Sequence, residues 1–166
     1  MNTKTRKIVL TAMLAALCCV ATMIIKIPSP LNGFINLGDC VVLLAGFGLP
    51  PVYGFLAAGI GSALADIFSG YVVYAPATFI IKGIMALAAY YGFKYLSKRC
   101  RKTPARIISG AFSEILMAAG YLTFEGFLYG FAASMVNIPA NLIQGCAGLI
   151  LGVILAEIFD KHKILM

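Results

Sequence analysis

Long apolar runs, separated by short polar or proline-containing segments, dominate the pattern of the chain. Apolar runs of about 20 residues predict helices that cross the hydrocarbon core of a membrane. We expect six spans, which are Ile8–Ile27, Asp39–Leu49, Val52–Phe68, Pro76–Tyr95, Arg106–Phe124 and Ile138–Phe159. The second is short, and we expect it to tilt or to continue partly through the following turn. The pattern therefore predicts an all-α bundle of six transmembrane helices that forms a single domain over residues 1–166.

The composition supports the same fold class. The chain has 166 residues, 61% of them hydrophobic and 11% charged, with a mean hydropathy of +0.96. These values lie outside the range of soluble globular domains. Six spans and their short connections use the whole length, so we expect no separate soluble catalytic domain.

The positive charge is concentrated in three clusters, although the net charge of +7 would also suit a nucleic-acid-binding protein. The clusters are Lys4, Arg6 and Lys7; Lys94, Lys98, Arg99, Arg101, Lys102 and Arg106; and Lys161 and Lys163. Because they alternate with apolar spans, the positive-inside rule places all three on the cytoplasmic side, together with both termini. The pattern indicates a multi-pass protein of a cell membrane and no nucleic-acid partner.

Residue patterns for catalysis, metals or cofactors are absent from the sequence. The one histidine, His162, lies in the C-terminal tail, and no Walker phosphate-binding loop occurs. The five cysteines are scattered, which indicates neither a disulfide framework nor a metal cage. We therefore expect a protein that is not an enzyme and that carries no cofactor or metal.

Polar residues converge instead on one membrane face, which the charge clusters identify as the outer one. This face receives the loop before the second span, the turn between the third and fourth spans, and a segment from Glu125 to Asn137 that we expect to be a loop or helix end. Small-molecule sites are apolar pockets with a few convergent polar groups. The candidate substrate-binding residues are Asn36, Asp39, Asp66, Tyr71, Tyr74, Lys82, Glu125, Asn137, Asn141 and Gln144.

The charged members of this set each have a structural alternative. We expect Asp66 to be the charge partner of Lys82, and that pair could contact a ligand or only hold two helices together. Asp39 could simply cap the helix that begins there. Glu114, the most deeply placed acid, suits a proton relay or a polar contact with a neighbouring helix.

Small residues mark one face of the first span. Ala12 and Ala16 lie four positions apart and therefore stack on the same side of a helix. Small residues let helices approach closely in lipid, where packing drives association. This face could serve packing within the bundle or contact with a partner.

The chain resembles the S components, the substrate-binding membrane subunits of energy-coupling factor (ECF) vitamin transporters. The resemblance rests on the pair Ala12 and Ala16 and on the segments Ile35-Asn-Leu-Gly-Asp39, Gly61-Ser-Ala-Leu-Ala-Asp66 and Tyr74-Ala-Pro-Ala-Thr-Phe-Ile-Ile-Lys-Gly83. It spans the chain, is sharpest between Asn36 and Gly83, and is greatest to the riboflavin, pyrimidine and pyridoxine group.

The resemblance implies a six-helix bundle that captures a water-soluble vitamin or precursor at the outer face. It also implies association with a transmembrane coupling subunit and two cytoplasmic ATPase subunits, with Ala12 and Ala16 on the coupling surface. The absence of tryptophan disfavours a thiamine-type site, whereas Tyr71, Tyr74, Tyr121 and Tyr129 offer aromatic surfaces for a heterocycle. A self-sufficient secondary carrier or channel is the alternative, although we see no internal repeat.

Overall fold

The computed structural model describes residues 3–29, 31 and 33–162. Lys163, assigned above to the C-terminal basic cluster, lies outside the described residues. The main helices are α1 (Thr3–Ile24), α2 (Gly38–Gly48), α3 (Pro51–Phe68), α4 (Ala75–Leu96), α5 (Lys102–Tyr129) and α7 (Ile138–Lys161). A short helix α6 (Phe131–Ser134) and a 3-10 turn η1 (Met135–Asn137) connect α5 to α7, and β1 (Ile27–Pro28) pairs antiparallel with β2 (Phe34–Ile35).

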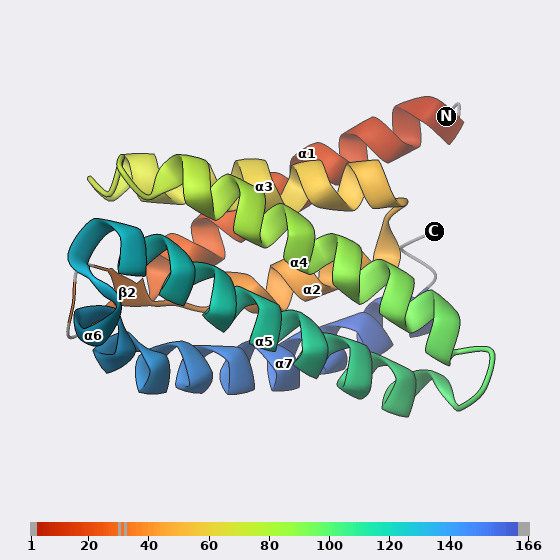
Figure 1. Cartoon of the computed structure of the whole chain (residues 1–166). Helices are drawn as coiled ribbons and strands as arrows, with labels where there is room; N and C mark the ends of the chain where they lie inside the picture. Colours follow the sequence, from red (N-terminus) through yellow and green to blue (C-terminus); the bar gives the residue numbers. More distant parts are fainter. Residues whose placement is uncertain (1–2, 30, 32, 163–166) are drawn as a thin grey trace.

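Five of the helices are long and apolar enough to cross a membrane, the last of them counted from Phe131 to Lys161. The second expected span, Asp39–Leu49, corresponds to α2, which has only 11 residues, and all of them are buried. It lies inside the bundle in contact with α1, α3, α4 and α7 (Figure 1). The structure is therefore an all-α bundle in which five membrane-length helices surround a short central one.

Small residues bring the helices close together. A Cβ atom at Gly61 of α3 would lie 2.4 Å from the carbonyl oxygen of Ala15 in α1, so only glycine allows this crossing. At the α3–α4 crossing, the rings of Phe55 and Phe79 meet edge to face, with centroids 5.4 Å apart. Close contact of this kind is what stabilises helix pairs in lipid.

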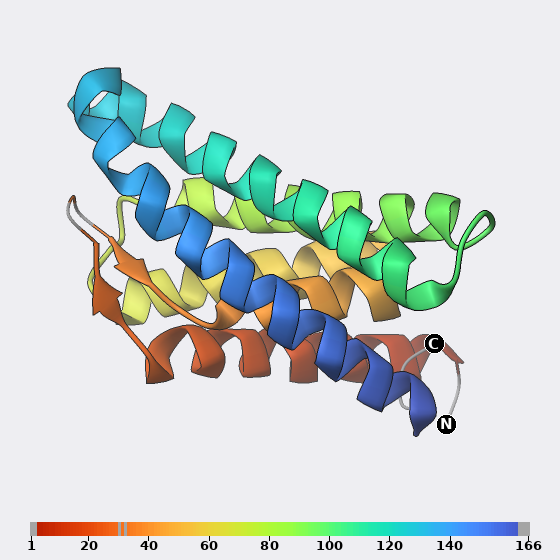
Figure 2. The ribbon, with the colours of Figure 1, turned by 90° about the horizontal axis from the view of Figure 1, so that it is seen from below.

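The two ends of the bundle differ in structure. At one end lie the β1–β2 hairpin, the turn between α3 and α4, and the α6–η1 segment; we call this the hairpin end (Figures 1 and 2). At the opposite end α1 begins, α7 ends, and a loop joins α4 to α5; we call this the terminal end (Figures 1 and 2). The three loops expected on one face are thus brought together at the hairpin end.

The helix α5 is longer than expected at both ends. It starts at Lys102 and runs through Glu125 to Tyr129, where Gly130 ends it with a backbone φ of +88°. Glu125 therefore belongs to a helix and not to a loop. Near the start of α5, the Arg106 guanidinium donates to Asp160 Oδ2 of α7 at 2.6 Å, which ties the two helices together at the terminal end.

Candidate functional site

A polar pocket lies at the hairpin end, enclosed by the hairpin and the ends of four helices. It is lined by Ser29, Gly33, Phe34, Ile35, Asn36, Asp66, Tyr71, Tyr74, Thr78, Tyr121, Glu125, Asn137, Ala140, Asn141 and Gln144. Eight of the ten residues predicted from the sequence are among them; Asp39 and Lys82 are not. Side chains far apart in the sequence thus share one pocket.

The hairpin covers this pocket and is attached to α7 and its approach. The backbone N–H of Leu31 donates to Asn137 Oδ1 at 3.1 Å, and that of Asn36 donates to Gln144 Oε1 at 2.9 Å. The Phe34 ring packs against Tyr71 with centroids 5.1 Å apart. The remaining cavity measures about 50 Å³, which leaves room for no more than a few water molecules.

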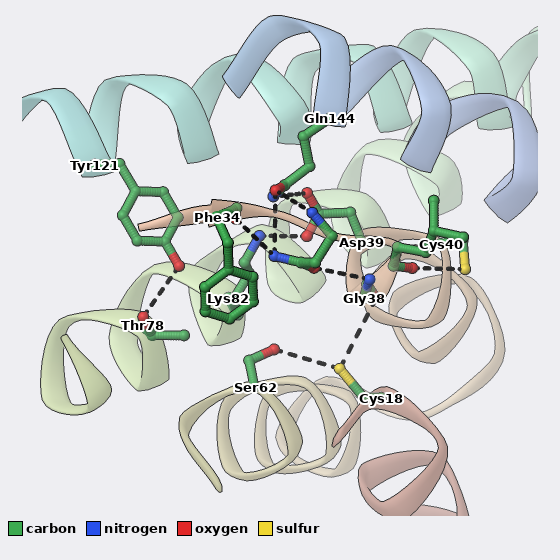
Figure 3. Close-up of polar contacts among 12 residues, drawn as sticks. Cys18, Phe34, Gly38, Asp39, Cys40, Ser62, Thr78, Lys82, Tyr121 and Gln144 are labelled. Carbon is green, nitrogen blue, oxygen red and sulfur yellow. Dashed lines mark hydrogen bonds and ion pairs between the residues drawn. The ribbon is translucent and has the colours of Figure 1, made fainter. Parts of the chain in front are cut away.

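An ion pair between Asp39 of α2 and Lys82 of α4 lies beneath the pocket wall. Both side chains are buried, and the Lys82 ammonium donates to Asp39 Oδ1. The Gln144 amide donates to Asp39 Oδ2 at 2.7 Å and so connects the pair to the pocket (Figure 3). Asp39 therefore reaches the pocket through Gln144 and not directly.

This geometry corrects two interpretations of the sequence. The expected charge partner of Lys82, Asp66, is wrong, because the buried ammonium pairs with Asp39. Asp39 also does not cap α2, since its carboxylate is used by Lys82 and Gln144. Asn36, which lies just before the helix, instead accepts the Gly38 N–H with its Oδ1 at 2.9 Å.

Two further residues connect Lys82 to the wall. The Lys82 ammonium lies 5.4 Å from the centroid of the Tyr121 ring, a cation–π distance. The Tyr121 hydroxyl lies 3.0 Å from the Thr78 hydroxyl, and both residues line the pocket. A substitution of Lys82 would therefore reach the wall at Tyr121 as well as at Gln144.

The wall nearest the α5–α7 connection centres on Glu125. Its Oε1 accepts the Asn137 amide at 2.9 Å and lies 3.5 Å from the Tyr74 hydroxyl. Its Oε2 is buried and has no hydrogen-bond partner among the described residues. Asp66 of α3 likewise has a buried Oδ2 that finds no hydrogen-bond partner in the described part of the chain.

Glu114 lies outside the pocket. It faces a mostly apolar groove between α5 and α7 with a cavity of about 170 Å³, and Gly145 and Gly148 of α7 leave room for its carboxyl group. Neither of its oxygens has a hydrogen-bond partner in the described part of the chain. The expected polar contact with a neighbouring helix is therefore not found.

Ala12 and Ala16 are exposed and do not pack within the bundle. They line a groove between α1 and α3 with a cavity of about 470 Å³ and an almost entirely apolar wall. The neighbouring Ala15 makes the contact with Gly61 instead. Packing within the protein's own bundle thus does not explain the two predicted alanines.

Thr78 lines the pocket although the sequence did not predict it, and Tyr121 was expected only as one of four possible aromatic surfaces. A helical pattern could have found them, because Tyr74, Thr78 and Lys82 follow one another at intervals of four on one face of α4. Tyr121 stands four positions before Glu125 in α5 in the same way. Tyr129, considered above as an aromatic surface, does not line the pocket.

Comparison with known proteins identifies the family. A family model described as "ECF-type riboflavin transporter, S component" matches residues 2–161. A Pyrococcus woesei protein described as an "uncharacterized protein in gap 3′ region" is 32% identical over 144 residues, which is 86% of this chain and 94% of that protein.

A solved structure has the same fold. It is described as the structure of the S component of a bacterial ECF transporter; the TM-score is 0.77 at 26% identity, over 96% of this chain and 98% of the other. These matches confirm the resemblance seen in the sequence and the membrane bundle. They also confirm that the function is transport and not catalysis. The chain belongs to the family of substrate-binding S components of ECF-type riboflavin transporters.

Proposed function

We propose that this S component binds riboflavin, or a vitamin of similar shape, in the pocket beneath the hairpin and passes it to a coupling subunit. The observation that carries the proposal is the convergence of eight predicted polar or aromatic residues on one pocket at the hairpin end. Riboflavin is named in the description of the matching family. Its flat ring system and hydroxylated chain require an apolar surface next to hydrogen-bonding groups.

The pocket offers both kinds of surface. Phe34, Tyr71 and Tyr74 form a row of rings whose neighbouring centroids are 5.1 Å and 6.3 Å apart. Amide side chains of α7, those of Asn141 and Gln144, stand in the same wall. Aromatic side chains favour flat heterocycles, while amides both donate and accept hydrogen bonds to ring edges and hydroxyl groups.

Ligand entry requires the cover to move. A cavity of about 50 Å³ is far smaller than the roughly 300 Å³ or more of ordinary ligand pockets. The hairpin is a suitable moving part, since its sheet consists of two two-residue strands. We infer that the hairpin opens by releasing the bonds from Leu31 to Asn137 and from Asn36 to Gln144, and closes again over the bound vitamin.

The hairpin end faces the outside in this proposal, and the terminal end faces the cytoplasm. The basic residues support this orientation, because the loop between α4 and α5 carries Lys98, Arg99 and Arg101. The partners are a transmembrane coupling subunit and two cytoplasmic ATPase subunits. The exposed groove at Ala12 and Ala16 is the surface on which we place the coupling subunit.

The orientation is tested at Cys100, which is exposed in the α4–α5 loop. In a variant that retains Cys100 as its single cysteine, we expect an impermeant thiol reagent to label the protein in inverted vesicles but not in intact cells. A matched variant that carries its single cysteine at Val73 of the α3–α4 turn should show the opposite pattern. Labelling of Cys100 from outside intact cells would contradict the proposed orientation.

The ligand is tested by thermal unfolding of the detergent-purified chain. A ligand present at 100 times its Kd stabilises the folded state by about 2.7 kcal/mol, which we expect to raise the melting temperature by several degrees for riboflavin. Thiamine, which the composition disfavours, is the control. Absence of a thermal shift with riboflavin would reject the proposed ligand. In liposomes the chain alone should bind riboflavin without accumulating it. Accumulation would favour a self-sufficient carrier.

A further inference from the structure

We propose that Asp66 and Glu125 select the unphosphorylated vitamin and exclude its phosphate ester. This inference rests on the proposed function, because it concerns the ligand of the same pocket. It assigns a specificity role to two carboxyl groups that sequence analysis could place only as general candidates.

Asp66 supplies the first carboxyl group. Its side chain is 8% exposed and stands in the pocket wall at the end of α3. The Thr78 hydroxyl lies close to this carboxyl group, but Oδ2 is buried and has no hydrogen-bond partner in the described structure. A buried carboxylate oxygen without a partner is energetically unfavourable, and a ligand N–H or O–H group would satisfy it.

Glu125 supplies the second carboxyl group from α5. It is 3% exposed, and Asn137 and Tyr74 satisfy only Oε1. Its Oε2 has no partner among the described residues. The pocket therefore contains two carboxyl oxygens without a hydrogen-bond partner among the described residues, one from α3 and one from α5.

Basic groups that could balance a negatively charged ligand are missing from the lining of the described pocket. Eleven of the 13 basic residues belong to the three clusters, which leaves Lys26 and Lys82. Lys82 is already paired with Asp39 below the wall. Lys26 is exposed and is not a lining residue; its ammonium donates to Ser69 Oγ at 2.7 Å and lies 5.6 Å from the centroid of the Phe34 ring, on the rim of the pocket.

A phosphate group in this pocket would share the wall with two carboxyl groups and with no basic side chain among the described lining residues. Like charges that are partly removed from water repel strongly, and neither partner can be stabilised by hydrogen bonds, because both are acceptors. Hydroxyl and ring N–H groups, in contrast, donate to carboxylates in charge-assisted bonds. The electrostatics therefore favour a neutral or amine-bearing ligand that is rich in donors.

The test compares the affinities of riboflavin and riboflavin 5′-phosphate for the purified full-length chain by titration calorimetry. For the wild type we expect the phosphate to bind at least about tenfold more weakly. The isosteric variants Asp66→Asn and Glu125→Gln remove charge while keeping shape, and the double variant should reduce this preference by about tenfold. Glu157→Gln, which removes an exposed acid at the terminal end, should leave the preference unchanged.

The outcomes separate this inference from the proposed function. Equal wild-type affinities for the two flavins would overturn the inference and leave the proposed function in place, whereas absence of riboflavin binding would overturn both. The wild-type comparison needs no variant to fold, and melting temperatures show which variants do. A preference that persists in the double variant but changes in Lys26→Met would also overturn the role of the two acids.

Discussion

Replacement of Asp39 by asparagine, or of Lys82 by methionine, is expected to lower the melting temperature of the detergent-purified protein by on the order of 10 °C. Each substitution leaves one buried group without its ion-pair partner, at 0% exposure for Asp39 and 3% for Lys82. Breaking a buried pair in this way costs about 3 to 5 kcal/mol. Thermal unfolding followed by intrinsic tyrosine fluorescence measures the effect.

The double variant Asp39→Asn/Lys82→Met separates the ion pair from the fold. Because it removes both charges together, it should recover most of the stability that each single substitution loses. Gln144 can still donate to the amide oxygen at position 39, so the contact with the pocket wall remains possible. Failure of the double variant to recover stability would show that the pair is not the source of the loss.

Glu114 provides a sharper control for the same experiment. A Cβ atom at Gly148 would contact both Asp39 and Glu114 Oε1, which places Glu114 close to the ion pair. Neither Glu114 oxygen has a hydrogen-bond partner in the described part of the chain. If the Lys82 ammonium pairs with Glu114 once Asp39 is lost, Asp39→Asn should lower the melting temperature less than Lys82→Met does. The double variant Asp39→Asn/Glu114→Gln should then lower it as much as Lys82→Met. If Asp39→Asn and Lys82→Met lower the melting temperature equally, Glu114 does not replace Asp39 as the partner of Lys82.

Ligand affinity gives a second readout for Lys82. If Lys82 orders the pocket through Tyr121 and Gln144, the folded double variant should bind riboflavin about 1.5 to 3 kcal/mol more weakly, roughly tenfold to a hundredfold in Kd. The contacts that support this expectation are the cation–π contact with Tyr121 and the bond from Gln144 to Asp39. Wild-type affinity in a folded double variant would limit Lys82 to a structural role.

The membrane class and most helix positions could be predicted from the sequence, because hydrophobic runs and prolines act locally. The bounds Val52–Phe68 and Pro76–Tyr95, for example, differ from α3 and α4 by one residue at each displaced end. The convergence of polar groups at one end could also be predicted, since basic clusters mark the other end. These inferences need no knowledge of which helices touch.

The partner of Lys82 could not be predicted in this way. Asp66 is the acid nearest to it in the sequence on the preceding helix, whereas Asp39 is 43 positions away. The choice depends on α2 lying inside the bundle against α4, which is a property of the tertiary packing. Proximity in the sequence therefore gave the wrong pair although both acids were recognised as candidates.

The length of the apolar stretch before Pro50 does indicate where α2 lies. An apolar stretch of about 10 to 14 residues is more typical of a buried core helix than of a span. The stretch before Pro50 has this length and no polar face beyond Asp39, as expected for a helix whose 11 residues are all buried. Reading it as a core helix would have placed Asp39 inside the bundle, within reach of Lys82.

Replacement of Ala12 or Ala16 by tryptophan is expected to abolish riboflavin uptake by the assembled transporter while leaving binding by the isolated chain unchanged. Both alanines are exposed along the groove between α1 and α3, and neither lines the pocket at the hairpin end. A tryptophan ring would fill the groove and keep a partner helix from the close approach that small residues allow. Met13→Trp is the matched control, since Met13 is 61% exposed on the same helix but does not line the groove.

Two measurements are needed, because loss of uptake alone could also arise from misfolding. Calorimetric affinity for riboflavin and the melting temperature should match the wild type in both variants, while co-purification of the coupling subunit and its ATPases is lost. Met13→Trp should retain both uptake and co-purification, since position 13 is exposed and does not line the groove. If the Ala12 and Ala16 variants assemble and transport like the wild type, the coupling subunit must dock on another face. The next surface to substitute would be the apolar groove between α4 and α5, which is lined in part by Ile80, Ile84 and Gly120.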